Sequence, residues 1–170
     1  MGTPTGPHGR LIAFGNELIR IHLQLREDLA RVKTELDAHL AGRGERPREL
    51  RAHCLAFCSA VTRHHTGEDD GAFPALALRF PELRPVIVKL AEDHVLIAGI
   101  LHRLDQLLGG IPEEPDAAEA RRVRSELDGL AAILESHFVF EERRITAALN
   151  ELPPETGTVQ SLLGMSARPD

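Results

Sequence analysis

Two histidine–glutamate pairs with the same spacing are the residues in this sequence most suited to chemistry. His64 precedes Glu68 in HHTGEDD, and His137 precedes Glu141 in SHFVFEERRI. Residues four apart lie above one another on the same face of an α-helix, so each imidazole would stand beside its carboxylate. A carboxylate is almost never buried without a partner charge or a metal ion. If the pairs are buried, they indicate a cation site.

Apolar residues recur at helical spacing around both pairs, which predicts that the pairs face the core. Those near the first pair are Cys54, Phe57, Cys58 and Val61, and those near the second are Leu127, Leu130, Leu134, Ile145 and Leu149. Helical bundles hold two metal ions in this way, with His and Glu ligands one turn apart on facing helices.

Two further histidines, His22 and His94, fall in the apolar stripes of two other predicted helices. A single histidine on an apolar face is more often a hydrogen-bonded core residue than a ligand. One histidine per helix, with two glutamates, favours a metal centre instead. Imidazole and carboxylate without thiolate suit iron, manganese or zinc. Six such ligands are too many for one tetrahedral zinc and suit two ions that keep open positions.

Four amphipathic helices must position these residues. The apolar periodicity predicts helices over about 9–40, 47–65, 81/85–108 and 116–150. We therefore expect an all-α, antiparallel up-down-up-down four-helix bundle over residues 9–152. Gly67, Gly71 and Pro74 predict a break or bend after the second helix, although Glu68 must stay in its last turn to pair with His64. Residues 1–8 are expected to form a disordered leader and 153–170 a flexible C-terminal tail.

Composition narrows the class of protein. A net charge of −6 argues against a nucleic-acid or acidic-membrane partner, and no apolar stretch is long enough to span a bilayer. Cys54 and Cys58 are too few for a secreted disulfide framework, so they are interpreted as reduced core thiols, with a redox role as the alternative. The protein is expected to be cytoplasmic.

The order H…HxxxE…H…HxxxE on four helices resembles the hemerythrin-like, HHE cation-binding family. Phe73–Pro74 and Glu141–Glu142 add to the likeness, which covers roughly residues 11–152. The resemblance implies a non-haem di-iron centre, with zinc or manganese less favoured. It implies that two of the ligands bridge the ions, and it assigns the six metal ligands as His22, His64, Glu68, His94, His137 and Glu141.

One position departs from the family pattern. Oxygen-carrying hemerythrins have a second histidine four residues after the third-helix one, where this chain has Ala98. His102 lies one turn further on and is a poor substitute. His65 could serve as an extra ligand, with a surface or outer role as the alternative, and Glu142 could take the place of Glu141. The missing histidine shifts the expectation from oxygen carriage toward sensing of iron or oxygen, or toward turnover of peroxide or nitric oxide.

Three functions are compatible with the sequence. The first is a di-iron protein that binds or reacts with O₂, peroxide or NO, as a carrier, a sensor or an oxidoreductase. The second is a non-catalytic iron-responsive or iron-holding module. The third is a metal-free bundle, which would have to bury two glutamates without a cation.

Overall fold

The computed structural model describes residues 12–42, 47–110 and 116–169, and these residues form helices and connecting turns without a strand. The all-α class predicted from the sequence is confirmed. The elements in chain order are α1 (Phe14–Leu40), α2 (Pro47–Gly67), the π-helical turn η1 (Glu68–Ala72), α3 (Phe73–Arg79), the 3₁₀ turn η2 (Pro81–Leu83), α4 (Arg84–Gly109), α5 (Ala117–Asn150), the 3₁₀ turn η3 (Pro154–Thr156) and α6 (Val159–Leu163).

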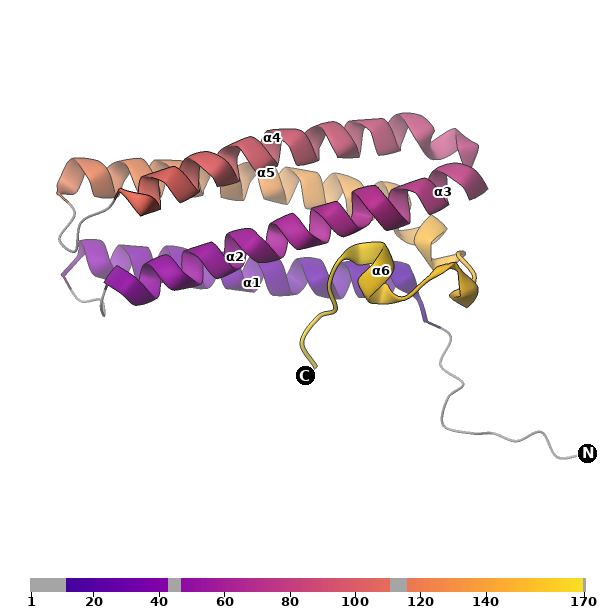
Figure 1. The fold of residues 1–170 in the computed structure, drawn as a ribbon, viewed down its shortest axis with the longest axis horizontal. Coiled ribbons are helices and arrows are strands. Elements are labelled where there is room, and N and C mark those ends of the chain that lie inside the picture. The colour runs from indigo at the N-terminus through magenta and orange to yellow at the C-terminus, as the bar shows by residue number, and fades with distance from the viewer. Residues whose placement is uncertain (1–11, 43–46, 111–115, 170) are drawn as a thin grey trace, which may run out of the picture.

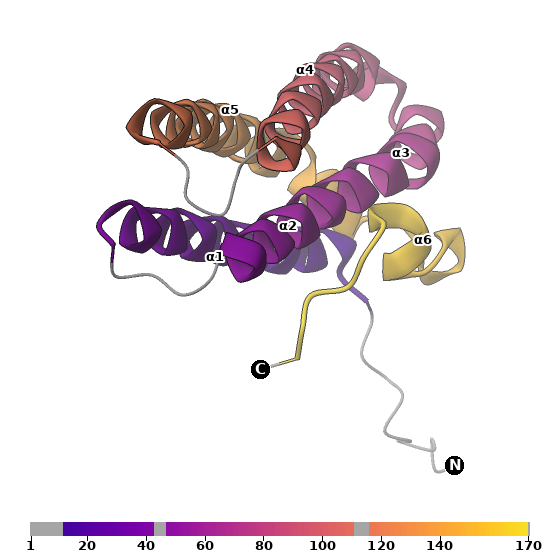
Figure 2. The same cartoon turned by 60° about the vertical axis from the view of Figure 1, so that its left-hand side comes forward.

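The four long helices, α1, α2, α4 and α5, run lengthwise beside one another (Figure 1). Helix α1 contacts α2 and α5, and α4 contacts the same two helices from the other side. Figure 2 shows α3 continuing the line of α2, with α6 beside them. The interior is therefore enclosed by one face of each long helix. None of the described helices is both long enough and apolar enough to cross a membrane.

The buried face of α1 illustrates why these residues form a helical core. Leu18, Ile21 and Leu25 are at most 1% exposed and recur at intervals of three and four residues. Each such side chain contributes about 1.5–3 kcal/mol when it leaves water. The predicted start at residue 9 is not confirmed, because Ala13 has an extended backbone and α1 begins at Phe14. The predicted leader, residues 1–8, lies outside the described residues.

The predicted break or bend after the second helix takes the form of a change in helix type, and the chain does not form a loop there. Gly67 and Ala72 both have right-handed helical dihedral angles, and the chain continues through η1 into α3. A π-helical turn bonds each N–H five residues back, as the Phe73 N–H does to the Glu68 carbonyl. This wider turn lies just before Pro74, whose ring would meet a carbonyl in a regular helix. Glu68 thus stays one turn after His64.

The C-terminal stretch also differs from the expected flexible tail. Thr158 and Ser161 form a reciprocal capping box at the start of α6, and Leu162 and Leu163 are buried in the core. A five-residue helix is too short to show a periodic apolar pattern, so α6 could not be predicted from the sequence.

Candidate metal centre

The structure brings the six residues singled out in the sequence into one buried cluster. Each long helix supplies one histidine, η1 supplies one glutamate and α5 supplies the other. None is more than 4% exposed, which confirms the prediction that they face the core. The cluster consists of His22, His64, Glu68, His94, His137 and Glu141.

One half of the cluster is formed by α1 and α2. Nε2 of His22 lies 3.2 Å from Nε2 of His64 and 3.5 Å from Oε1 of Glu141. Nε2 of His64 lies 3.2 Å from Oε1 of Glu68. Two imidazole nitrogens at this separation repel each other through their lone pairs unless a proton or another cation lies between them.

The other half is formed by α4 and α5. Nε2 of His137 lies 3.2 Å from Oε2 of Glu141, and Nε2 of His94 lies 3.7 Å from Oε1 of Glu68. Each glutamate therefore stands beside one histidine of each half. This arrangement makes the two carboxylates common to both halves of the cluster.

The outer nitrogen of every one of the four histidines donates a hydrogen bond away from the cluster. The four acceptors and N–O distances are Glu142 for His22 (3.2 Å), the Leu163 carbonyl for His64 (2.7 Å), Asp69 for His94 (2.8 Å) and Asp93 for His137 (3.1 Å). A donor at Nδ1 fixes the tautomer and leaves the Nε2 lone pair facing inward. Metal-binding histidines are held in this way.

Most of the inward-facing atoms lack hydrogen-bond partners among the described residues; the exceptions are Nε2 of His22 and of His64, which contact each other. Nε2 of His94 and His137 and both carboxylate oxygens of Glu68 and Glu141 are buried and unpaired. Contacts of 3.2–3.7 Å to neighbouring imidazoles exist, but their geometry does not make hydrogen bonds. Buried polar groups are normally paired, and a buried carboxylate needs a cation. The donor set therefore fits metal ions. Two groups of three within the six residues, His22 with His64 and Glu141 and Glu68 with His94 and Glu141, have ligand atoms within 4.8 Å of one another.

Burial and the neighbouring charges shift the pKa values of the two glutamates and of His64. Burial and the nearby Glu141 charge raise the pKa of Glu68 well above its usual value. Burial acts against ionisation of Glu141 as well, but the imidazoles of His137 and His22 hold its pKa well below the usual value. Burial and the charge of His22 lower the pKa of His64 to about 3. His64 is thus neutral and its Nε2 is free to bind a metal.

Several residues outside the six have roles that the sequence left open. Glu142 lies beside His22 Nδ1 and forms an ion pair with Arg26 (2.9 Å), so it supports His22 and does not replace Glu141. His102 is exposed. His65 is only 5% exposed, so the alternative of a surface role is wrong.

The C-terminal segment holds His64 through backbone contacts. The Leu163 carbonyl accepts the His64 Nδ1–H, and Gly164 follows with φ +77°, in the left-handed region that favours glycine. A Cβ on Gly164 would meet the Arg63 carbonyl oxygen at 1.9 Å. Only glycine allows the chain to lie this close to α2. The signal in the sequence was a single glycine after an apolar pair, too little to predict this contact.

Replacing Gly164 with alanine should therefore weaken metal binding from a distance. The clash displaces the Leu163 carbonyl and frees the His64 ring, and loss of such an outer partner typically costs about 10–100-fold in metal affinity. Competition with a chromophoric chelator measures the change. Gly129→Ala is the matched control, because a Cβ there meets nothing within 4 Å. Equal affinities for the two variants would contradict a role for the C-terminal segment.

The fold and the site together define a class of all-helical proteins. Proteins of this class bury a cluster of imidazoles and carboxylates that suits cations. Residues 15–149 match the hemerythrin HHE cation binding domain family, and the chain belongs to that family. The matched region contains all six residues of the cluster and ends before α6. Comparisons with curated proteins and with solved structures gave no match.

Proposed function

We propose that the protein is a non-haem di-iron protein that binds or reacts with O₂, peroxide or NO inside an antiparallel up-down-up-down four-helix bundle. The observation that carries the proposal is the set of buried, unpaired Nε2 and carboxylate atoms that face one another in the cluster. Family membership supports a cation as their partner.

The two halves of the cluster suggest which residues hold each ion. His22 and His64 would hold one ion, and His94 and His137 the other. Glu68 and Glu141 lie beside a histidine of each half and would serve both ions. Neither cysteine joins any of the potential ligand groups among the described residues, and a nitrogen and oxygen donor set suits iron.

The protein's own residues prepare the site for a small ligand. An iron pair with open positions supplies ligand binding and electron transfer. The outer hydrogen bonds of the four histidines orient each ring with its Nε2 aimed inward, so little reorganisation is needed on binding. The Phe138 ring stacks on His22 and the Phe73 ring on His94, so apolar side chains cover part of the site. A cytoplasmic location agrees with the free thiols of Cys54 and Cys58.

The non-catalytic, iron-responsive module remains the second candidate, and one observation favours it. His64 is joined directly to the C-terminal segment by the bond to Leu163. Loss of the ion would free the His64 ring and weaken the packing of α6 against α2. The conformation of the C-terminal segment would then depend on whether iron is bound.

Spectroscopy with small ligands tests the first function. We expect the iron-loaded protein to show a ligand-to-metal band that changes on addition of peroxide or NO, and His137→Ala to abolish it. Steady-state peroxide or NO consumption then separates an enzyme from a carrier or sensor. A two-iron protein whose spectrum is unchanged by O₂, peroxide and NO would contradict the proposal and leave the iron-responsive module.

A further inference from the structure

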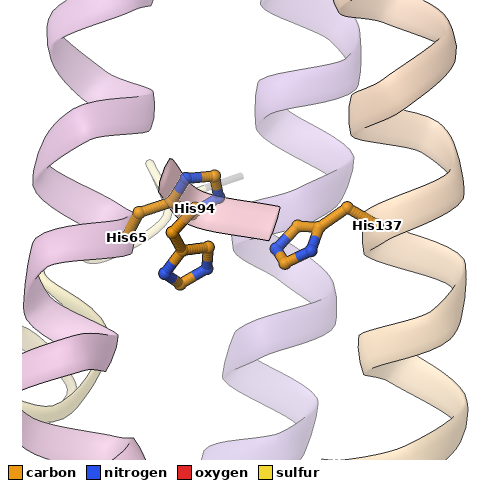
Figure 3. Close-up of side chains that lie close together, drawn as sticks. All are labelled: His65, His94 and His137. Atoms are coloured by element: carbon orange, nitrogen blue, oxygen red, sulfur yellow. The ribbon is translucent and has the colours of Figure 1, made fainter. Parts of the chain in front are cut away.

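His65 lies in the last turn of α2, next to His64, and is buried against α4. Adjacent residues of a helix point about 100° apart, so His65 would not be expected to share a site with His64. The bundle nevertheless directs it toward the half of the cluster formed by α4 and α5. Figure 3 shows the His65, His94 and His137 rings gathered between their helices.

The geometry of these three rings is close and specific. The His65 ring stacks on that of His94, with centroids 3.9 Å apart and planes 10° from parallel. It meets the His137 ring edge to face at 5.1 Å. Each of the three histidines offers a ligand atom within 4.8 Å of those of the other two.

A core histidine that only fills space should have its polar atoms paired. Nε2 of His65 is buried and has no hydrogen-bond partner among the described residues, as is also true of His94 and His137. Each of the three histidines thus has a buried, unpaired Nε2, and each offers a ring nitrogen within 4.8 Å of one on the other two. Stacking explains why the three rings lie together, but it does not explain why their buried Nε2 atoms have no hydrogen-bond partner.

We propose that His65 is a metal ligand, which gives the ion held by α4 and α5 three imidazoles. The inference rests on the proposed metal centre and adds a ligand from α2 to it. The two halves of the centre then differ, with two histidines on one side and three on the other. Such a difference makes the two ions unequal in affinity and in the number of open positions.

Ala98 on α4 offers an independent check. It lines the same hollow of about 170 Å³ as His65 and His94. Its side chain is small, which leaves room for a larger one. A histidine introduced at this position can therefore approach the place that His65 occupies.

The experiment compares His65→Phe with the wild type in stepwise Co²⁺ titrations of the full chain. Phenylalanine keeps the stacked ring on His94 but has no nitrogen, so packing and ligation are separated. We expect the affinity of one of the two sites to fall by at least about 10-fold and its d–d absorption to shift, with the other site unchanged. His102→Phe, at an exposed position of α4, is the matched control and should leave both sites unaltered.

The double variant His65→Phe, Ala98→His should restore affinity at the weakened site. If the wild type binds two Co²⁺ ions and His65→Phe binds both with unchanged affinity and spectrum, His65 is not a ligand. If the wild type itself binds no ion, the proposed metal centre fails, which is a different result. Should His65→Phe not fold, His65→Ala in the same titration gives the same two outcomes.

Discussion

Glu68→Gln is expected to remove both metal ions and, at the same time, to stabilise the metal-free protein. Glu68 stands beside His64 and His94, one in each half of the centre, so both ions lose a carboxylate. Without metal, the buried Glu68 faces Glu141, and burial with that charge raises its pKa. A neutral amide of the same shape avoids this cost, and replacing buried ionised residues by uncharged ones of similar volume is often neutral or stabilising by about 1–4 kcal/mol.

The variant should lose metal content while the free energy of unfolding of its metal-free form increases, so two independent quantities test the prediction. Metal content is measured by elemental analysis, and the free energy of unfolding by denaturant titration in excess chelator. Glu92→Gln, an exposed change on α4, is the control and should alter neither quantity. A Glu68→Gln protein that keeps two ions would show that the carboxylate is not a ligand.

Metal removal from the wild type is the second large effect. An ion that binds only the folded state stabilises it by about 4 kcal/mol when its free concentration is 1,000 times Kd. For a chain of this size, the loss of each such ion lowers Tm by roughly 8–16 °C. Calorimetry with and without a chelator measures the shift, and Glu68→Gln should show none.

Hydrogen exchange shows where that stability is lost. Because the Leu163 carbonyl holds His64, amides of α6 should lose protection first when the metal is removed. Equal Tm values for the metal-loaded and chelated wild type would contradict the coupling between metal and fold.

The spacing of residues was enough to predict the core of the site. His64 and Glu68, or His137 and Glu141, lie one turn apart in sequence, and their apolar neighbours fix which way they face. Both properties follow from helical geometry alone. The four helices could therefore be placed from the sequence, whereas the full set of six ligands was implied only by the resemblance to the hemerythrin-like family.

What the sequence did not predict depends on contacts between distant segments. The sequence left His65 open between an extra ligand and a surface or outer role, and only the packing against His94 of α4 shows that its ring is buried. Gly67 and Gly71 looked like helix breakers, yet each lies where the C-terminal segment comes within contact distance of the helix backbone. Glycine occurs both where a helix ends and where another segment packs closely against a helix. The sequence alone does not distinguish these two cases.

We propose that this bundle holds two iron ions between His and Glu side chains. The most direct measurement is the iron content per chain after reconstitution of the purified protein with Fe²⁺ and removal of unbound metal. We expect two irons per chain in the wild type. Zinc in place of iron, a single ion, or no bound metal would contradict it.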